Sequence, residues 1–332
     1  MSSALANGLA GAGGGIIAQI ITYPLQTVNT RQQTERVSRE GRDSRGSALF
    51  QILQVVRSEG LPGLYSGLKP SLLGTAVSQG VYYYFYQVFK NRAEAIAAAN
   101  KKRGRGDGSV GMLSWLVVAA LAGSVNVLLT NPIWVLVTRM QTHTQAERKI
   151  ASSLEVQLAE LDSLKPHPYG TLQAAREVYN ESGVTGFWKG VIPALIMVSN
   201  PSIQFMIIES LSKQLRAKRA AKNKDQQNIT ALEVFVIGAF AKLGATVCTY
   251  PLLVVKSRLQ AKQEISGNVS LRYSGTVDAI IKMIHHEGFR CFYQGMRTKI
   301  VQSVFAASVL FMVKEELVKV YAVLANKSKV NV

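Results

Sequence analysis

The chain has 332 residues, of which 48% are hydrophobic and 17% are charged, and its formal net charge is +18. Soluble domains usually contain about 25% charged residues, so this composition argues against a chain made of ordinary soluble domains. The positive charge has two interpretations: basic loops beside anionic lipid headgroups, or attraction of an anionic substrate.

The charged residues are clustered, and four long stretches contain none. These stretches are residues 1–30, 70–89, 108–138 and 190–208. A helix that spans a membrane needs about 20 apolar residues, so each stretch is long enough to form one. A nucleic-acid-binding protein does not need such stretches, and we therefore predict no nucleic-acid partner. Polar residues within them predict helices with one face toward lipid and the other toward water: Gln79, Asn126 and Gln204.

The first predicted unit covers residues 4–93, with membrane spans at 5–25 and 68–89 joined by a loop that contains a surface helix. The run GAGGG at 11–15 is compatible with a dinucleotide-binding turn. No strand pattern precedes it, however, and no acid follows at the required distance. We therefore interpret these small residues as sites where helices approach closely.

The second predicted unit covers residues 110–214, with spans at 112–132 and 190–209. It is longer than the other two units between corresponding positions, and its extra residues are polar. This pattern predicts a surface loop insertion at residues 143–167.

The third predicted unit covers residues 229–321, with spans at 231–251 and 298–318. A charge at membrane depth is costly and normally faces a cavity or a partner, so we expect this of Lys242. Lys299 begins the last span, and it either faces the same cavity or extends to the membrane interface.

The three units share two motifs. In the first motif, Arg and Gln follow a proline by seven and nine positions, in residues 22–33, 130–141 and 249–260. The second motif has two glycines seven residues apart, with an aromatic residue two positions before the second. Its glycine pairs are Gly60 and Gly67, Gly183 and Gly190, and Gly288 and Gly295.

Recurrence of two motifs at three places predicts an all-α membrane protein with six transmembrane helices. The helices form three tandem two-helix repeats with pseudo-threefold symmetry and short surface helices on one side. The motif prolines kink the odd-numbered spans, because proline removes one backbone hydrogen bond. These prolines are Pro24, Pro132 and Pro251.

The repeated motifs resemble the mitochondrial carrier family over nearly the whole chain. The form NPIWVLVTRMQ, with Trp134 where most carriers have an acid, is similar to the branch that moves folate, flavin, pyrimidine nucleotides and NAD. The segments GLAGAGGGIIAQ and AKLGATVCTYPLLVVKSRLQAKQ resemble members of this branch that carry NAD in plant peroxisomes. The resemblance implies an antiporter of the peroxisomal membrane that imports NAD in exchange for AMP or ADP. It also implies alternating access, function as a monomer, and no cofactor or metal.

The resemblance further implies two gates. In the family, the lower gate has an acid two residues after each motif proline and a base five residues after it. The acid positions here hold Gln26, Trp134 and Leu253, and the base positions hold Asn29, Val137 and Lys256. The upper gate positions hold Gln87, Lys90, Glu209 and Glu315. Few ion pairs are possible, so we expect hydrogen bonds and apolar packing to close both gates. Trp134 either belongs to the gate or anchors its helix at the membrane interface.

The family's substrate contact points correspond to three adjacent pairs in this chain: Gly74 and Thr75, Ile196 and Met197, and Gln302 and Ser303. The resemblance implies that Lys242, Lys299 and Arg139 neutralise a pyrophosphate through charge-assisted hydrogen bonds. The alternative interpretation is that Gly74, Ile196 and Met197 only pack helices together.

Two other functions stay open: a carrier for coenzyme A, FAD or ATP, and a membrane scaffold or receptor that does not transport. The sequence offers no catalytic nucleophile, metal-binding cluster or paired acid and base, so we predict that it is not an enzyme.

Two cysteines exclude a disulfide framework and predict an intracellular membrane. The alternative location is the mitochondrial inner membrane. Residues 90–107 contain six Lys and Arg in eighteen positions, which predicts cytosolic termini under the positive-inside rule.

Overall fold

The computed structural model describes residues 3–36, 48–104, 109–153, 169–222, 230–261 and 273–330. Within these ranges the chain is almost entirely helical and contains no strand. The long helices are α1 (Ser3–Thr34), α3 (Leu68–Lys102), α4 (Met112–Ser153), α8 (Asn200–Lys222), α9 (Ala231–Gln260) and α11 (Met296–Val330). The shorter helices are α2 (Ala48–Leu64), α6 (Thr171–Ser182), α7 (Val191–Met197) and α10 (Thr276–Glu287). Two 3₁₀ helices, η1 (Val184–Trp188) and η3 (Phe289–Tyr293), complete the described elements.

The order of these elements repeats three times, which confirms the predicted all-α fold with two long helices in each repeat. Each repeat begins with a long helix that contains the motif proline: α1, α4 or α9. A surface helix follows, and the second long helix begins after the second motif glycine. Among the described residues, three helical segments are both long and apolar enough to cross a membrane: Met112–Ala146, Val184–Ala217 and Glu233–Gln260.

Two features of the second repeat differ from the prediction. Helix α4 continues to Ser153, so the first part of the predicted loop insertion is helical, and residues 154–168 lie outside the described ranges. The second span is not one continuous helix, because α7 ends at Met197 and α8 begins at Asn200. Pro201 explains the restart, since proline fits the first helical turn but lacks the N–H that an uninterrupted helix requires.

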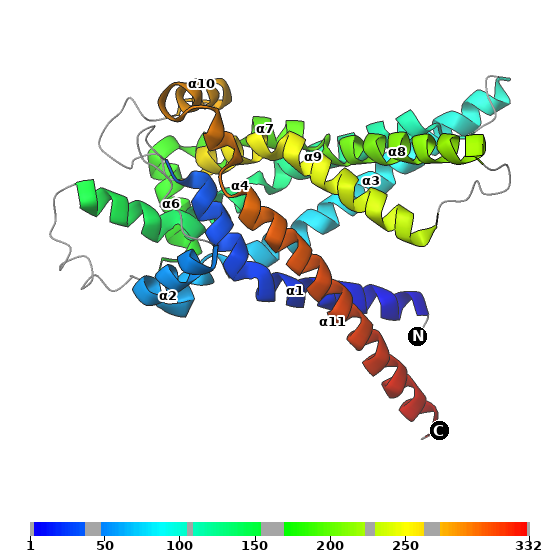
Figure 1. Ribbon diagram of the computed structural model, residues 1–332, viewed down its shortest axis with the longest axis horizontal. Coiled ribbons are helices and arrows are strands. Elements are labelled where there is room, and N and C mark those ends of the chain that lie inside the picture. The colour runs from blue at the N-terminus through cyan, green and yellow to red at the C-terminus, as the bar shows by residue number, and fades with distance from the viewer. Residues whose placement is uncertain are drawn as a thin grey trace.

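The surface helices α2, α6 and α10 gather at one end of the molecule (Figure 1). The long helices diverge toward the other end, where both termini lie, and α1 changes direction along its length (Figure 1). The second long helix of each repeat packs against the first long helix of the next, pairing α3 with α4, α8 with α9, and α11 with α1. This arrangement closes the three repeats into a ring.

Close helix packing occurs at only some of the small residues. A Cβ atom at Gly123 of α4 would lie 2.7 Å from Val198 Cγ1, so a larger residue does not fit there without movement. Gly15 and Gly238 have open space around them. The interpretation of the 11–15 run as a packing site is therefore wrong for Gly15.

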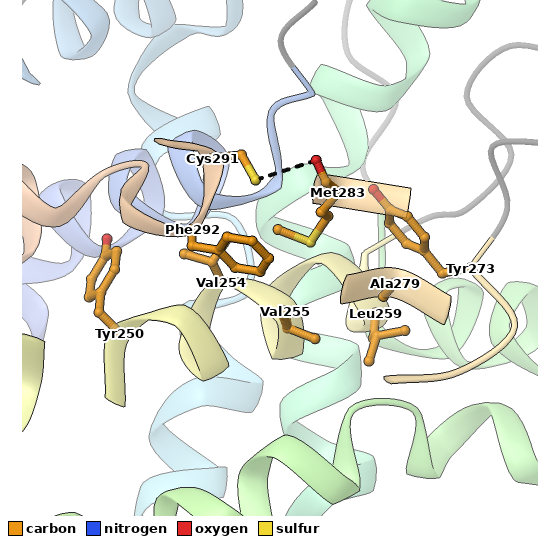
Figure 2. Close-up of a cluster of buried hydrophobic side chains, with 9 residues drawn as sticks. All are labelled: Tyr250, Val254, Val255, Leu259, Tyr273, Ala279, Met283, Cys291 and Phe292. Carbon is orange, nitrogen blue, oxygen red and sulfur yellow. Dashed lines mark hydrogen bonds between the residues drawn. The ribbon is translucent and has the colours of Figure 1, made fainter. Parts of the chain in front are cut away.

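A cluster of buried side chains attaches α9 to the surface helix of its own repeat (Figure 2). Its members come from α9, α10, η3 and the segment before α10: Tyr250, Val254, Val255, Leu259, Tyr273, Ala279, Met283, Cys291 and Phe292. Burial raises the pKa of the Cys291 thiol to about 11, so this thiol stays protonated at neutral pH. Cys291 therefore acts as a small packing residue and not as a reactive thiol.

Candidate gate and substrate site

The glycines of the second motif shape the connection to the second long helix, and one glycine of each pair lets neighbouring repeats approach closely. All six have positive φ angles, between 63° and 79°, a conformation that glycine adopts without steric penalty. The second glycine of each pair also lies against the proline-containing helix of the next repeat. A Cβ atom at Gly67 would lie 3.2 Å from Val137 O, one at Gly190 would lie 3.2 Å from Lys256 O, and one at Gly295 would lie 2.9 Å from Asn29 Oδ1. These contacts link repeats 1 to 2, 2 to 3 and 3 to 1.

The motif arginines form one buried ion pair in each repeat. Arg31 Nη1 lies 2.7 Å from Glu59 Oε1, and Arg258 Nη2 lies 3.0 Å from Glu287 Oε2. Arg139 pairs with Glu181 in the same way. Each pair fastens the end of a long helix to the surface helix that follows it.

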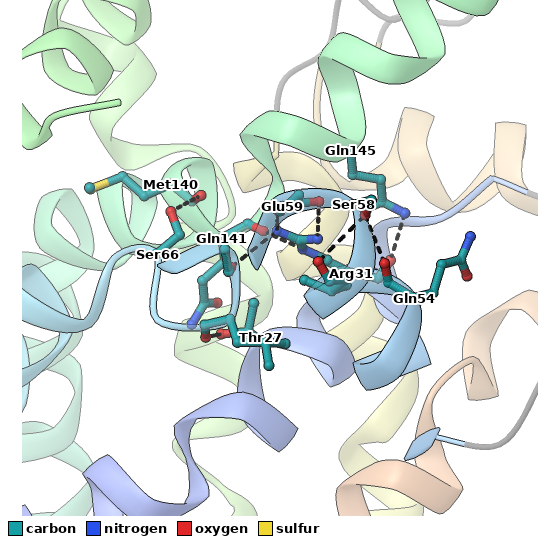
Figure 3. Close-up of polar contacts among 12 residues, drawn as sticks. Thr27, Arg31, Gln54, Ser58, Glu59, Ser66, Met140, Gln141 and Gln145 are labelled. Carbon is teal, nitrogen blue, oxygen red and sulfur yellow. Dashed lines mark hydrogen bonds and ion pairs between the residues drawn. The ribbon is translucent and has the colours of Figure 1, made fainter. Parts of the chain in front are cut away.

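The same arginines also reach across to a neighbouring repeat. The Nε atom of each arginine donates to the backbone carbonyl of a motif glutamine, over distances of 2.8, 3.1 and 3.0 Å. The pairs are Arg31 with Gln141, Arg139 with Gln260, and Arg258 with Gln33. Figure 3 shows the first of these arginines with Glu59 and Gln141. Arg139, which we expected at a substrate pyrophosphate, is instead buried between Glu181 and the next repeat.

The glutamine side chains complete a second ring of hydrogen bonds between repeats. Gln33 Nε2 donates to Tyr250 Oη over 3.3 Å, and Gln141 Nε2 donates to Tyr23 Oη over 3.0 Å. In the third position of the ring, Gln260 Nε2 lies 3.3 Å from Asn131 Oδ1. The three long helices are thus joined at this end by neutral side chains.

The acceptors in this ring all directly precede a motif proline. They also donate to the turn before the second long helix: Tyr23 to Ser66 O, Tyr250 to Gln294 O, and Asn131 to Phe187 O. The spacing of Pro, Arg and Gln in the first motif assigns no role to the residue before the proline. A hydroxyl or amide side chain at this position in all three repeats was the signal that could have identified it.

A cavity of about 230 Å³ lies beside this ring. All six residues at the lower gate positions line it: Gln26, Asn29, Trp134, Val137, Leu253 and Lys256. Lys299 and Gln302 of α11 line it as well, and Lys299 Nζ donates to Gln302 Oε1 over 3.1 Å. The structure therefore brings two of the expected substrate residues to the gate.

The other expected substrate residues lie away from this cavity lining. A Cβ atom at Gly74 would lie 2.9 Å from Ile133 Cγ2 and 3.8 Å from Trp134 Cε2, so this glycine permits close packing of α3 on α4. Thr75 Oγ1 donates to the carbonyl of Ser71 in its own helix. Ile196 is half exposed, and Met197 and Ser303 are partly exposed. Lys242 is exposed.

The upper gate residues bond along their own helices in this conformation. Gln87 Nε2 donates to Asn91 Oδ1 over 2.9 Å. Lys90 Nζ lies 3.9 Å from Glu94 Oε1, and Glu209 Oε1 lies 2.8 Å from Lys213 Nζ. The side chain of Glu315 lies outside the described residues.

Comparison with known proteins identifies the family. The family described as Mitochondrial carrier protein matches residues 1–95, 108–219 and 227–323, which together cover most of the chain. The chain belongs to the mitochondrial carrier family. This result confirms the family resemblance expected from the two repeated motifs.

This carrier is similar to several curated proteins along most of their length. It is 64% identical over 322 residues to the peroxisomal nicotinamide adenine dinucleotide carrier of Arabidopsis thaliana, and the match covers 96% of each chain. It is 31% identical to the peroxisomal membrane protein PMP34 of Mus musculus, over 94% of this carrier and 92% of that protein. It is also 31% identical to the chloroplastic nicotinamide adenine dinucleotide transporter 1 of Arabidopsis thaliana, over 92% and 89% of the two chains.

Proposed function

We propose that this carrier imports NAD into peroxisomes in exchange for AMP or ADP by alternating access. The observation that carries the proposal is a gate closed at one end of diverging helices, beside a cavity whose charged residues are lysines. The 64% identity to a peroxisomal NAD carrier supports both the substrate and the membrane.

The geometry supports alternating access because hydrogen bonds join the three proline-containing helices, α1, α4 and α9, to one another at one end of the helix ring. At the other end, the described gate residues bond within their own helices. Movement of the three proline-containing helices would open the hydrogen-bonded end and close the other end. A bound substrate can drive this movement only by binding the two states with different affinity.

The charge distribution supports an anionic substrate. Lys242, Lys256 and Lys299 all lie in the third repeat, and the last two line the cavity at the closed gate. Ammonium groups form short, charge-assisted hydrogen bonds with phosphate oxygens. NAD and ADP carry a diphosphate and AMP a single phosphate, so the same lysines suit all three.

Purified carrier in liposomes tests this function. We expect uptake of labelled NAD into liposomes loaded with AMP or ADP, and only background uptake into liposomes without internal nucleotide. Preferred uptake of coenzyme A, FAD or ATP would overturn the choice of NAD. Absence of any nucleotide uptake by folded protein would favour a scaffold or receptor.

Cellular location needs its own experiment. We expect a fluorescently tagged carrier to coincide with a peroxisomal membrane marker. Coincidence with a marker of the mitochondrial inner membrane would contradict the proposed location without affecting the transport proposal.

A further inference from the structure

The closed gate contains a positive charge where the family pattern would provide an ion pair. Lys256 occupies the base position of the third repeat and lines the gate cavity. The acid positions hold Gln26, Trp134 and Leu253, which are neutral. Among the described residues that line this cavity, only Lys256 and Lys299 are charged.

No acid in the described part of the chain forms an ion pair with either lysine. The glutamates of the surface helices are already paired with the motif arginines: Glu59, Glu181 and Glu287. Lys299 donates one hydrogen bond to Gln302, although an ammonium group has three protons to donate. Both lysines are partly buried, and a cation withdrawn from water without a counter-charge is costly, so this closed state gains from an anion that enters.

A neutral polar side chain also lines the gate cavity, and its amide oxygen has no hydrogen-bond partner. Asn29 is 4% exposed and lines the cavity, and its Oδ1 atom has no hydrogen-bond partner. Asn29, Lys256 and Lys299 come from α1, α9 and α11, so an anion between them would join the first and third repeats.

We propose that the closed gate binds one phosphate-type anion through Lys256 and Lys299, and that this anion supplies the negative charge that the gate lacks. The cavity of about 230 Å³ is smaller than the roughly 300–1,000 Å³ of pockets that hold drug-sized ligands. It therefore takes a phosphate or diphosphate group and not a whole dinucleotide. The inference deepens the proposed function, because exchange of nucleotides would bring such groups to the gate.

Thermal unfolding of the purified full-length carrier in detergent tests the site with inorganic pyrophosphate as the probe. Pyrophosphate replaces an amount of chloride that keeps the ionic strength constant, because any salt screens exposed charges and so changes the unfolding temperature. We expect a saturable rise in the unfolding temperature of the wild type. Lys256→Gln and Lys299→Gln should each weaken apparent pyrophosphate binding about tenfold or more, since each removes a charged hydrogen-bond donor. Lys102→Gln is the matched control, because it removes one exposed lysine charge at the end of α3.

Further ligands identify the source of the phosphate group, and a second variant of Lys256 keeps the test valid if the first variant misfolds. NAD and AMP should stabilise the wild type, and the effect should depend on Lys256, whereas adenosine, which lacks phosphate, should not stabilise it. Lys256→Arg keeps the charge and should keep the response to pyrophosphate even if Lys256→Gln does not fold. Absence of saturable stabilisation, or wild-type affinity in both Gln variants, would overturn the site.

The site and the transport function can fail separately. NAD exchange in liposomes with no lysine-dependent stabilisation by pyrophosphate would refute the anion site and leave the proposed function standing. Lysine-dependent stabilisation without NAD exchange would support the anion site and refute the proposed substrate.

Discussion

The hydroxyl of Tyr23 offers a direct test of the closed gate, because Tyr23→Phe removes it and keeps the ring. The side chain is fully buried, so little else changes. Its Oη accepts a hydrogen bond from Gln141 Nε2 over 3.0 Å and donates to Ser66 O over 3.0 Å. Only the bond with Gln141 joins two repeats, and a neutral hydrogen bond contributes a net 0.5–1.5 kcal/mol, so its loss should destabilise this closed state relative to the open state by about 0.5–1.5 kcal/mol.

The destabilisation should appear as leakage. A change of about 0.5–1.5 kcal/mol shifts the equilibrium between closed and open gate by roughly 2- to 13-fold at 25 °C. Liposomes preloaded with labelled AMP should therefore lose it at least about twofold faster through Tyr23→Phe than through wild type, without external substrate. Release is measured against time after external nucleotide has been removed.

The matched control is Tyr65→Phe. The ring of Tyr65 stacks on that of Tyr23, with centroids 6.2 Å apart, but Tyr65 is 37% exposed and does not belong to the ring of hydrogen bonds between repeats. It should not leak. Tyr250→Phe removes the equivalent hydroxyl in the third repeat and should behave like Tyr23→Phe. Leakage at wild-type level in both ring variants, in folded protein, would refute the reasoning that these hydroxyls hold the gate closed.

Three further predictions concern neighbouring groups. Trp134→Ala should leak preloaded nucleotide or stall exchange if the indole closes the gate; normal exchange with background release would instead indicate a membrane anchor. Gly295→Ala, at φ 79° with a close contact, should lower the unfolding temperature more than Gly104→Ala, at φ 70° in open space, and equal losses would argue against the contact. Burial opposes ionisation of Glu181, but Arg139 and Lys189 together outweigh it and lower the pKa of this carboxyl. The ion pair should therefore stabilise the fold above pH 4.5 and lose its effect as pH falls through the lowered pKa. Glu181→Gln should cost about 3–5 kcal/mol at neutral pH and flatten this acid dependence, which unfolding measured against pH would detect.

The residues at the lower gate positions show which parts of the site can be predicted from spacing within one helix. The positions of Gln26, Trp134 and Leu253 followed from their spacing to the motif prolines, and the structure places all three around one cavity. Spacing within a helix fixes which face a side chain occupies, because each residue adds a constant rotation. The same reasoning could not say which residues share the cavity with Lys256, since several of them come from other repeats.

The sequence alone determined the repeats, the long helices and the positions of their prolines and glycines. These features depend on hydrophobic length and on backbone restrictions that act between residues close in the chain. It also determined that the lower gate positions hold no acid.

Only the tertiary structure decided which groups meet across repeats. Arg139 was a reasonable partner for a phosphate by sequence, but it is ion-paired with Glu181 and donates to the carbonyl of Gln260, 121 residues away. Gln33 likewise meets Tyr250 across 217 residues. Such contacts depend on how the three repeats close into a ring. Local propensity does not encode that closure, because these residues are far apart in the sequence and come into contact only after the helices have packed.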